Sequence, residues 1–184
     1  MQVASAPFDS SSRSTSFPTD TIIKMGDNVL FYCHRDVIKL ASDRLGDLCL
    51  ALRPSTAGGL EFIDGLPVIP IPEDAEVVRL ALQYIHPKTP IPILSPPKDI
   101  ISALQFHQEY GVSKLEDAGL RALEAFIACD AVLAFHIAMD FGVGNLAHLA
   151  SQRVLQLPLY RLHSHPFLLS RPNHQALVRY HVKC

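Results

Sequence analysis

The sequence lacks the features that mark secreted and membrane-spanning proteins. Its four cysteines are widely separated and include no Cys-x-x-Cys pair, which argues against a disulfide scaffold and a structural zinc site. The longest apolar stretch, residues 131–139, is interrupted by His136 and is far shorter than the roughly 20 residues needed to cross a bilayer. We therefore predict reduced thiols, no membrane span, and a cytoplasmic or nuclear location.

The chain also has no large excess of positive or negative charge. The chain carries 16 Lys and Arg against 18 Asp and Glu, for a net charge of -2. No run of Lys or Arg could neutralise several neighbouring phosphates together, so we predict that nucleic acid is not a partner. The first residues are polar and contain no apolar core of a secretory signal.

Sequence patterns of catalysis are not found either. There is no Gly-x-Ser-x-Gly elbow and no Glu-x-x-His pair. The glycines at 58–59 and 142–144 lack the spacing and the strand-to-helix context of a phosphate-binding loop. Cys33 and His34 are neighbours, but adjacent residues of a strand point to opposite faces, so we predict a buried, inert thiol. These observations predict no enzymatic activity, no cofactor and no metal site.

Nine histidines nevertheless leave one alternative of another class, a small histidine-dependent metalloenzyme. The densest pair is His163-Ser164-His165, whose rings would share a face in an extended segment. Pro158 and Pro166 bracket the pair, and no Asp, Glu or Cys lies beside it to complete a ligand set. A surface loop is the preferred interpretation.

Hydrophobic residues form 48% of the 184-residue chain and charged residues only 18%, which is enough apolar surface to offset the entropy of folding. The length suits one domain with an appendage. Residues 1–19 are rich in serine and predict a disordered leader.

Two β-prone runs, 21–25 and 29–32, flank turn-forming residues and predict a hairpin. Helical spacing between residues 34 and 52, with a break and a new N-cap at 42–43, predicts two short helices.

Prolines shape the middle of the chain. The apolar run 66–71 contains two prolines that cannot donate to a ladder, so it predicts an edge strand. An amphipathic helix follows and ends at His86, before Pro87. Residues 87–97 contain five prolines and predict an irregular connector.

The second half of the chain has helical patterns throughout. Residues 98–110 predict a helix that Gly111 closes as a left-handed C-cap. Ser113 and Glu116 resemble a capping box for the next helix, which should pack antiparallel to the first.

Three further helices, over 131–141, 145–155 and 174–181, predict a helical annex. The dense apolar stretch around residues 126–137 should pack internally, with an exposed groove for a partner helix as the alternative.

This order of elements resembles the BTB/POZ fold. The segments Asp20-Thr-Ile-Ile-Lys-Met25 and His34-Arg35-x-x-Ile38-x-x-Ala41-Ser42 are similar to the opening motifs of that family. The segments Leu66-Pro-Val-Ile-Pro-Ile-Pro-Glu-Asp74 and Leu82-x-Tyr84-Ile85 are similar to its edge strand and following helix. The resemblance covers residues 20–127, and residues 128–184 resemble the C-terminal helical extension of fungal BTB proteins. It implies an α+β, mostly helical fold with a small sheet flanked by helical hairpins.

The resemblance implies a non-catalytic protein-interaction module that forms homo- or hetero-oligomers. Asp20 and Arg35 match the acidic and basic positions that line a charged pocket at the dimer interface of BTB transcription factors. Such a pair disfavours partners that lack its complement. A substrate adaptor for a cullin-type ubiquitin ligase is the alternative, although residues 51–61 lack the hydrophobic-x-Glu motif of cullin-binding members. The residues before Asp20 contain little that could form the extra strand some dimers exchange.

Overall fold

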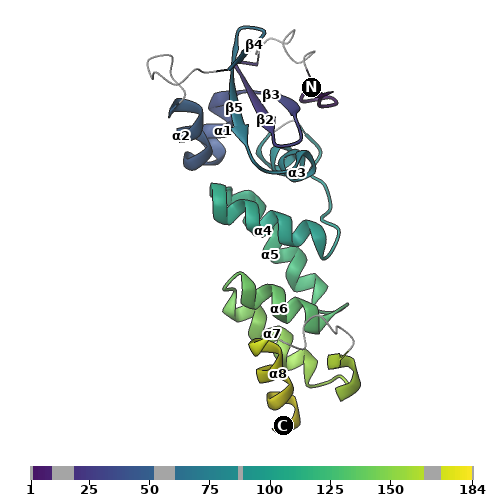
Figure 1. Ribbon diagram of the computed structural model, residues 1–184. Coiled ribbons are helices and arrows are strands. Elements are labelled where there is room, and N and C mark those ends of the chain that lie inside the picture. Colours follow the sequence, from purple (N-terminus) through teal and green to yellow (C-terminus); the bar gives the residue numbers. More distant parts are fainter. Residues whose placement is uncertain (1, 10–18, 52–60, 87–88, 164–170, 184) are drawn as a thin grey trace. The chain divides into compact units, whose positions relative to one another are not determined.

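The computed structural model describes residues 2–9, 19–51, 61–86, 89–163 and 171–183 (Figure 1). Within these ranges the chain is an α+β protein with a five-stranded mixed sheet and eight α-helices. It divides into two compact units. The first consists of Met1–Ile93 and Phe106–Glu116, and the second of Leu94–Gln105 and Asp117–Cys184.

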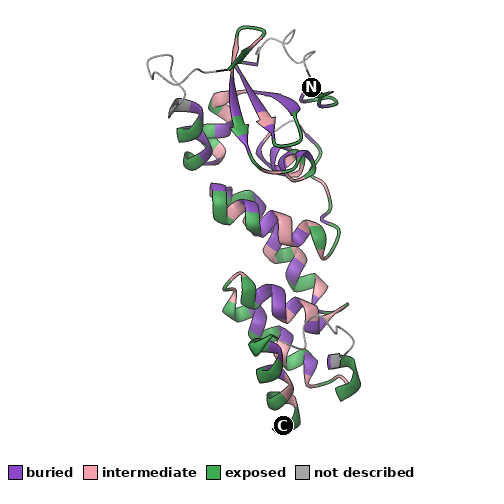
Figure 2. Cartoon of the chain, in the orientation of Figure 1, coloured by how far each residue is buried: buried purple, intermediate pink, exposed green. Residues whose placement is uncertain are grey.

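The sheet is built around the predicted hairpin, which is confirmed. Strands β2 and β3 pair antiparallel, and Asn28 in the turn adopts a φ of 62°, which Asn tolerates better than most residues. Ile22 and Ile23 are adjacent in β2 and both are buried, so both faces of this strand are covered (Figure 2). The strand order is β1-β3-β2-β5-β4, with bounds β1 Gln2–Val3, β2 Thr21–Met25, β3 Val29–Cys33, β4 Phe62–Ile63 and β5 Leu66–Ile71.

The N-terminal residues correct the prediction of a disordered leader. Strand β1 pairs in parallel with the start of β3, and the Tyr32 amide donates to the carbonyl of Phe8 at 2.9 Å. Ala4 and Phe8 are buried. Enough apolar surface is therefore present within residues 2–8 to hold this segment along the sheet edge, and a strand does precede Asp20. Residues 10–18 lie outside the described part of the chain.

Strand β5 fits the predicted edge position only over its second half. It pairs in parallel with β2 through Val68–Ile71, and antiparallel with β4 through Leu66 and Pro67. By strand order β5 is therefore internal. Only Leu66 and Pro67 of β5 pair with β4. Pro70 lies past these two residues, so its missing N–H costs no ladder bond to β4.

Three helices complete the first unit. Helices α1 (Arg35–Ala41) and α2 (Asp43–Ala51) confirm the two predicted short helices, and α3 (Ala75–Ile85) ends before His86 as expected. The predicted break at Ser42 is also confirmed, because its Oγ accepts from the Leu45 amide at 3.1 Å and caps α2. Irregular backbone is observed at residues 90–97, within the predicted connector.

The predicted helical hairpin is formed by α4 (Lys98–Tyr110) and α5 (Ser113–Phe126). Gly111 closes α4 with a φ of 73°, as predicted. The capping box is not formed as expected. Ser113 lies inside the first turn of α5, and a Glu116 oxygen is 3.3 Å from His107 Nε2.

The second unit has one continuous apolar core. It joins residues of α4 and α5 with the helices α6 (Ala131–Asp140), α7 (Gly144–Val154) and α8 (Pro172–Lys183) and with the 3₁₀ turn η2 (Leu159–His163). Leu123 and Val132 are buried in it and Phe126 packs against it, as the internal-packing prediction expects. The compact units therefore divide within α4 and α5, whereas the sequence suggested a boundary after residue 127. Buried side chains on both sides of residue 127 explain the difference.

Histidines tie α8 to the second unit. His136 Nε2 lies 3.1 Å from His174 Nδ1, and both rings are buried and stacked. His181 Nε2 is 2.8 Å from the carbonyl of Leu157. Of the predicted loop pair, His163 ends η2, while Ser164 and His165 fall outside the described residues.

Candidate interaction site

Asp20 and Arg35, the two residues singled out by the family resemblance, lie together where β2 begins and α1 begins. The Asp20 amide donates to the carbonyl of Cys33 at 3.2 Å, as an extension of the β2–β3 ladder. Asp20 Oδ1 accepts from the backbone amide of Arg35 at 2.7 Å. The hairpin register therefore brings the carboxylate to the first residue of α1.

The bond from Asp20 to the Arg35 amide makes Asp20 a helix cap rather than half of a buried ion pair. His34 occupies the N-cap position of α1 but makes no capping bond through its side chain. The Asp20 carboxylate supplies that acceptor, where the helix dipole favours negative charge. Asp20 is exposed and Arg35 is half-buried, so both side chains can be reached from solvent.

Two buried thiols lie close to Asp20 and Arg35. Cys33 Sγ is 3.7 Å from the carbonyl of Phe31, and Cys33 and Cys49 are both buried. Burial raises the pKa of Cys33 strongly, with smaller contributions from Cys49 and Asp20. Burial also raises the pKa of Cys49, to about 11, although Arg35 opposes this shift. Both groups are therefore expected to be thiols at neutral pH. The predicted burial of Cys33 is confirmed, and its inertness stays a prediction.

Helices α1 and α2 expose a surface that mixes apolar and charged side chains, which we call the α1–α2 surface. Leu40 is 89% exposed and Leu48 is 41% exposed. Asp36 and Lys39 are exposed on α1, close to Leu40 in the sequence. Reasoning from the sequence missed this surface, because helical spacing between residues 34 and 52 predicts helices without showing which apolar side chains the fold covers. Leu40 follows Ile38 by two residues, which is about 200° around a helix, so the two cannot share a face. The structure shows that Ile38 is the buried one.

Polar contacts hold α2 in place within the first unit. Ser42 Oγ donates to the carbonyl of Tyr110. Arg44 Nη1 donates to the carbonyls of Gln108 and Glu109 at 2.7 and 3.2 Å, at the C-terminal end of α4. An arginine there satisfies helix carbonyls that lack an intrahelical partner. The α1–α2 surface is thus presented by anchored helices.

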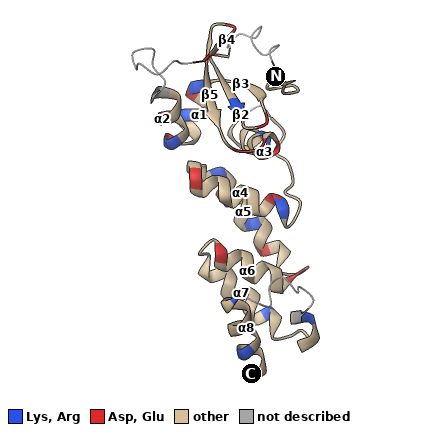
Figure 3. Cartoon of the chain, viewed as in Figure 1, with Lys and Arg blue, Asp and Glu red and all other residues tan. Residues whose placement is uncertain are grey.

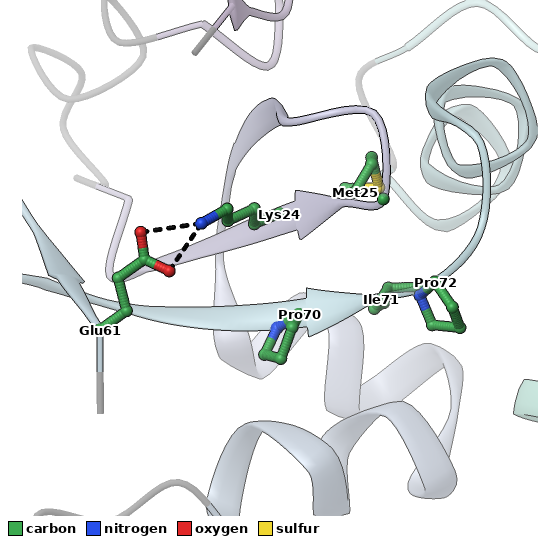
Figure 4. Close-up of a pocket in the computed structure, with 7 residues that line it drawn as sticks. Lys24, Met25, Glu61, Pro70, Ile71 and Pro72 are labelled. Atoms are coloured by element: carbon green, nitrogen blue, oxygen red, sulfur yellow. Dashed lines mark hydrogen bonds and ion pairs between the residues drawn. The ribbon is translucent and has the colours of Figure 1, made fainter. Parts of the chain in front are cut away.

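A second feature is an open hollow at the ends of β2 and β5 (Figure 4). Lys24 Nζ lies 2.8 and 2.9 Å from the two carboxylate oxygens of Glu61. The remaining lining is Met25, Gly26, Pro70, Ile71 and Pro72. Because its one amine is engaged by a carboxylate and its other side chains are apolar, the hollow offers no set of groups for acid–base or nucleophilic chemistry.

The described residues were searched for metal-ligand clusters and for membrane-spanning helices. No group of three or more His, Cys, Asp or Glu side chains in that part of the chain could hold a metal ion. None of the described helices is long and apolar enough to cross a membrane. The stretch 51–61, which bears on the cullin alternative, lies almost entirely outside the described residues.

No family model matches this sequence, and no curated protein matches it.

Proposed function

We propose that this chain is a protein-interaction module of the BTB/POZ type that associates with a second copy of itself through the α1–α2 surface. The observation that carries the proposal is Leu40, a large apolar side chain that is 89% exposed on α1. Anchoring of α2 by Ser42 and Arg44 supports it, because a preorganised surface loses less entropy on binding. Apart from the two-residue strands β1 and β4, the order of elements, a hairpin, two short helices, a strand, a helix and a helical hairpin, is the order that the resemblance implies.

Charged side chains on α1 and at its N-terminal end favour a second copy as the occupant. Asp20 and Asp36 are acidic, while Arg35 and Lys39 are basic, and all four are exposed or half-buried. A two-fold axis brings the same patch of both copies together, so a patch with both signs can pair with itself. Exposed ion pairs contribute little energy, and the apolar area of Leu40 must supply most of it.

The test is the molar mass of the full chain, measured by size-exclusion chromatography with light scattering over a range of concentrations. The wild-type chain should be a dimer at tens of micromolar. Leu40→Glu should weaken dimerisation at least about a hundredfold, because burying a leucine contributes about 1.5–3 kcal/mol per copy.

Ile93→Glu is the matched control, since Ile93 is 95% exposed outside α1 and α2. It should leave the mass unchanged. A wild-type chain that stays monomeric at about 100 μM argues against the self-association, as does an equal effect of the two substitutions. Capture of an unrelated protein that Leu40→Glu abolishes, without dimerisation, would assign the surface to a hetero-partner instead.

A further inference from the structure

Two histidines contact each other in the core of the second unit. His136 on α6 and His174 on α8 are each 1% exposed, and of the histidines that the structure describes only these two are buried. His136 Nε2 lies 3.1 Å from His174 Nδ1, and the ring centres are 5.3 Å apart. At this distance one ring donates its N–H to an unprotonated nitrogen of the other.

This hydrogen bond limits how many protons the pair can hold. Two neutral rings can form it, and so can one neutral and one protonated ring, because one of the facing nitrogens then keeps its lone pair. Two protonated rings cannot, since both facing nitrogens would carry a proton and two positive charges would meet in the core. In an exposed segment, by contrast, both histidines can take up a proton below about pH 6.5. Separating the two rings in mild acid therefore allows at least one more proton to bind.

The surroundings of the pair provide little negative charge to balance a second proton. No Asp or Glu follows Asp140 in the sequence, so α7, η2 and α8 contain no carboxylate side chain (Figure 3). Asp140 lies one turn after His136 on α6, but its Oδ2 is 2.7 Å from Nη1 of Arg171, whose charge neutralises it. Asp130, before α6, accepts from the Leu133 amide at 3.0 Å and caps the helix.

The other charged and titratable groups of the second unit are bonded elsewhere or exposed. His148 Nε2 on α7 is 3.0 Å from Gln152 Nε2, and His181 contacts a backbone carbonyl. The Asp99 carboxylate on α4 accepts from the Ser95 amide at 2.8 Å. The remaining Asp, Glu, Lys and Arg side chains described in this unit are exposed, among them Glu124 on α5, Arg153 on α7, Arg161 in η2, and Arg179 and Lys183 on α8.

Helix α8 is attached to the second unit by few buried side chains. Only His174 and Leu177 are buried among its 12 residues, and Val178 is half-buried. Helix α6, by contrast, buries six of its 10 residues. Segments with few buried contacts open locally at a lower free energy than the core does. Loss of the histidine contact should therefore affect the docking of α8 first.

We propose that the His136–His174 pair is a proton-sensitive latch, which holds α8 on the second unit at neutral pH and releases it in mild acid. At neutral pH exposed histidines are mostly uncharged, so opening gains almost no proton and α8 stays docked. Below about pH 6 the open form binds at least one additional proton, so the equilibrium constant for opening should rise about tenfold for each further pH unit. This inference concerns the second unit and is independent of self-association through α1 and α2.

The test is amide hydrogen exchange of the full chain between about pH 7.5 and pH 5, corrected for the intrinsic exchange rate at each pH. The opening constant of α8 should rise at least about tenfold between about pH 6 and pH 5, and that of α7 should change much less. His174→Gln should remove most of this rise, because the amide oxygen can accept from either protonation state of His136 and takes up no proton itself. His136→Gln tests the same bond from the other helix and should act in the same direction.

His148→Gln is the matched control, because it makes the same replacement at an exposed histidine on α7. It should leave the pH response of α8 as in the wild-type chain. The proposal is overturned if protection of α8 in the wild-type chain does not change with pH, or if α7 and α8 lose protection together, which would indicate general acid unfolding. It is overturned as well if both variants of the pair keep the wild-type response, or if His148→Gln reduces that response equally. The wild-type measurement needs no variant, so it decides the matter even if a variant does not fold.

Discussion

Asp20 connects the sheet to the first helix through a backbone contact. Its carboxylate accepts from the Arg35 amide, and the N-cap residue His34 contributes no capping bond. From the sequence, Asp20 and Arg35 could be predicted to lie close together. The form of the contact could not, because it depends on the hairpin register, which decides whether the carboxylate meets the amide or the guanidinium.

This contact predicts which substitution matters for stability. Asp20→Ala should lower the free energy of unfolding by about 1 kcal/mol, the usual effect of losing a helix cap. Arg35→Gln keeps the backbone amide, so the coupling energy between the two substitutions should stay below about 0.5 kcal/mol. Urea unfolding of the wild-type chain, both single variants and the double variant measures this. A coupling well above 1 kcal/mol would indicate a side-chain ion pair instead.

The buried thiols predict a pattern of chemical reactivity. In the native protein, iodoacetamide near pH 8 should modify the exposed Cys129 and leave Cys33 and Cys49 unmodified, because only the thiolate reacts and burial raises the pKa of both buried thiols. All three should react after unfolding in urea. Peptide mapping by mass spectrometry gives the result, and rapid native modification of Cys33 would contradict it.

The same shifts give a direction for the pH dependence of stability. Between the ordinary thiol pKa of about 9 and the pKa of about 11 for Cys49, the unfolded chain loses a proton that the native chain retains. The contribution of Cys49 to the free energy of unfolding is therefore fully present below about pH 9 and decreases as the pH rises toward 11. Cys49→Ala should make that decrease shallower.

At the scale of secondary structure, the helices and long strands followed from local patterns. Prolines and glycines marked the ends of α3 and α4. Hydrophobic periodicity located α5 and α7, and a stretch that is apolar nearly all round located α6. The two-residue strands β1 and β4 could not be predicted, because two residues carry no period. The internal position of β5 also escaped prediction. β5 pairs with β4 across the two-residue turn Asp64-Gly65, whose φ angles are 53° and 76°, and this Asp-Gly pair was the local signal of the hairpin.

Close packing of α4 against α5 predicts the effect of filling Gly119. A Cβ at this position would lie 3.0 Å from Leu104 Cδ2 and 3.5 Å from the Ala103 Cβ. Gly119→Val should therefore destabilise the protein by about 1–3 kcal/mol through overpacking. Gly144, at the start of α7, has no atom within 4 Å of the equivalent position, so Gly144→Ala should be neutral or stabilising by up to about 1 kcal/mol.

Thermal or urea unfolding of both glycine variants distinguishes packing from a general glycine effect. Adding Leu104→Ala to Gly119→Val should recover part of the loss, because it removes the side chain that is crowded. Equal effects of the substitutions at Gly119 and Gly144 would contradict the packing account.

At the scale of the whole molecule, two compact units share the α4–α5 hairpin. The sequence suggested an annex beginning after residue 127, yet the core of the second unit already includes Ile100, Leu104 and Leu123. Periodicity shows that a helix has an apolar face, but it does not show which neighbour covers that face. For the same reason, the exposed leucine on α1 and the buried histidine pair of α6 and α8 became evident only from the structure.

The most direct test of the central claim, self-association through α1 and α2, is amide hydrogen exchange of the full chain at low and high protein concentration. The account predicts that amides of residues 35–49 become more protected as the concentration rises, while those of α7 do not change. Exchange that is independent of concentration along the whole chain, or protection that appears only away from α1 and α2, would contradict it.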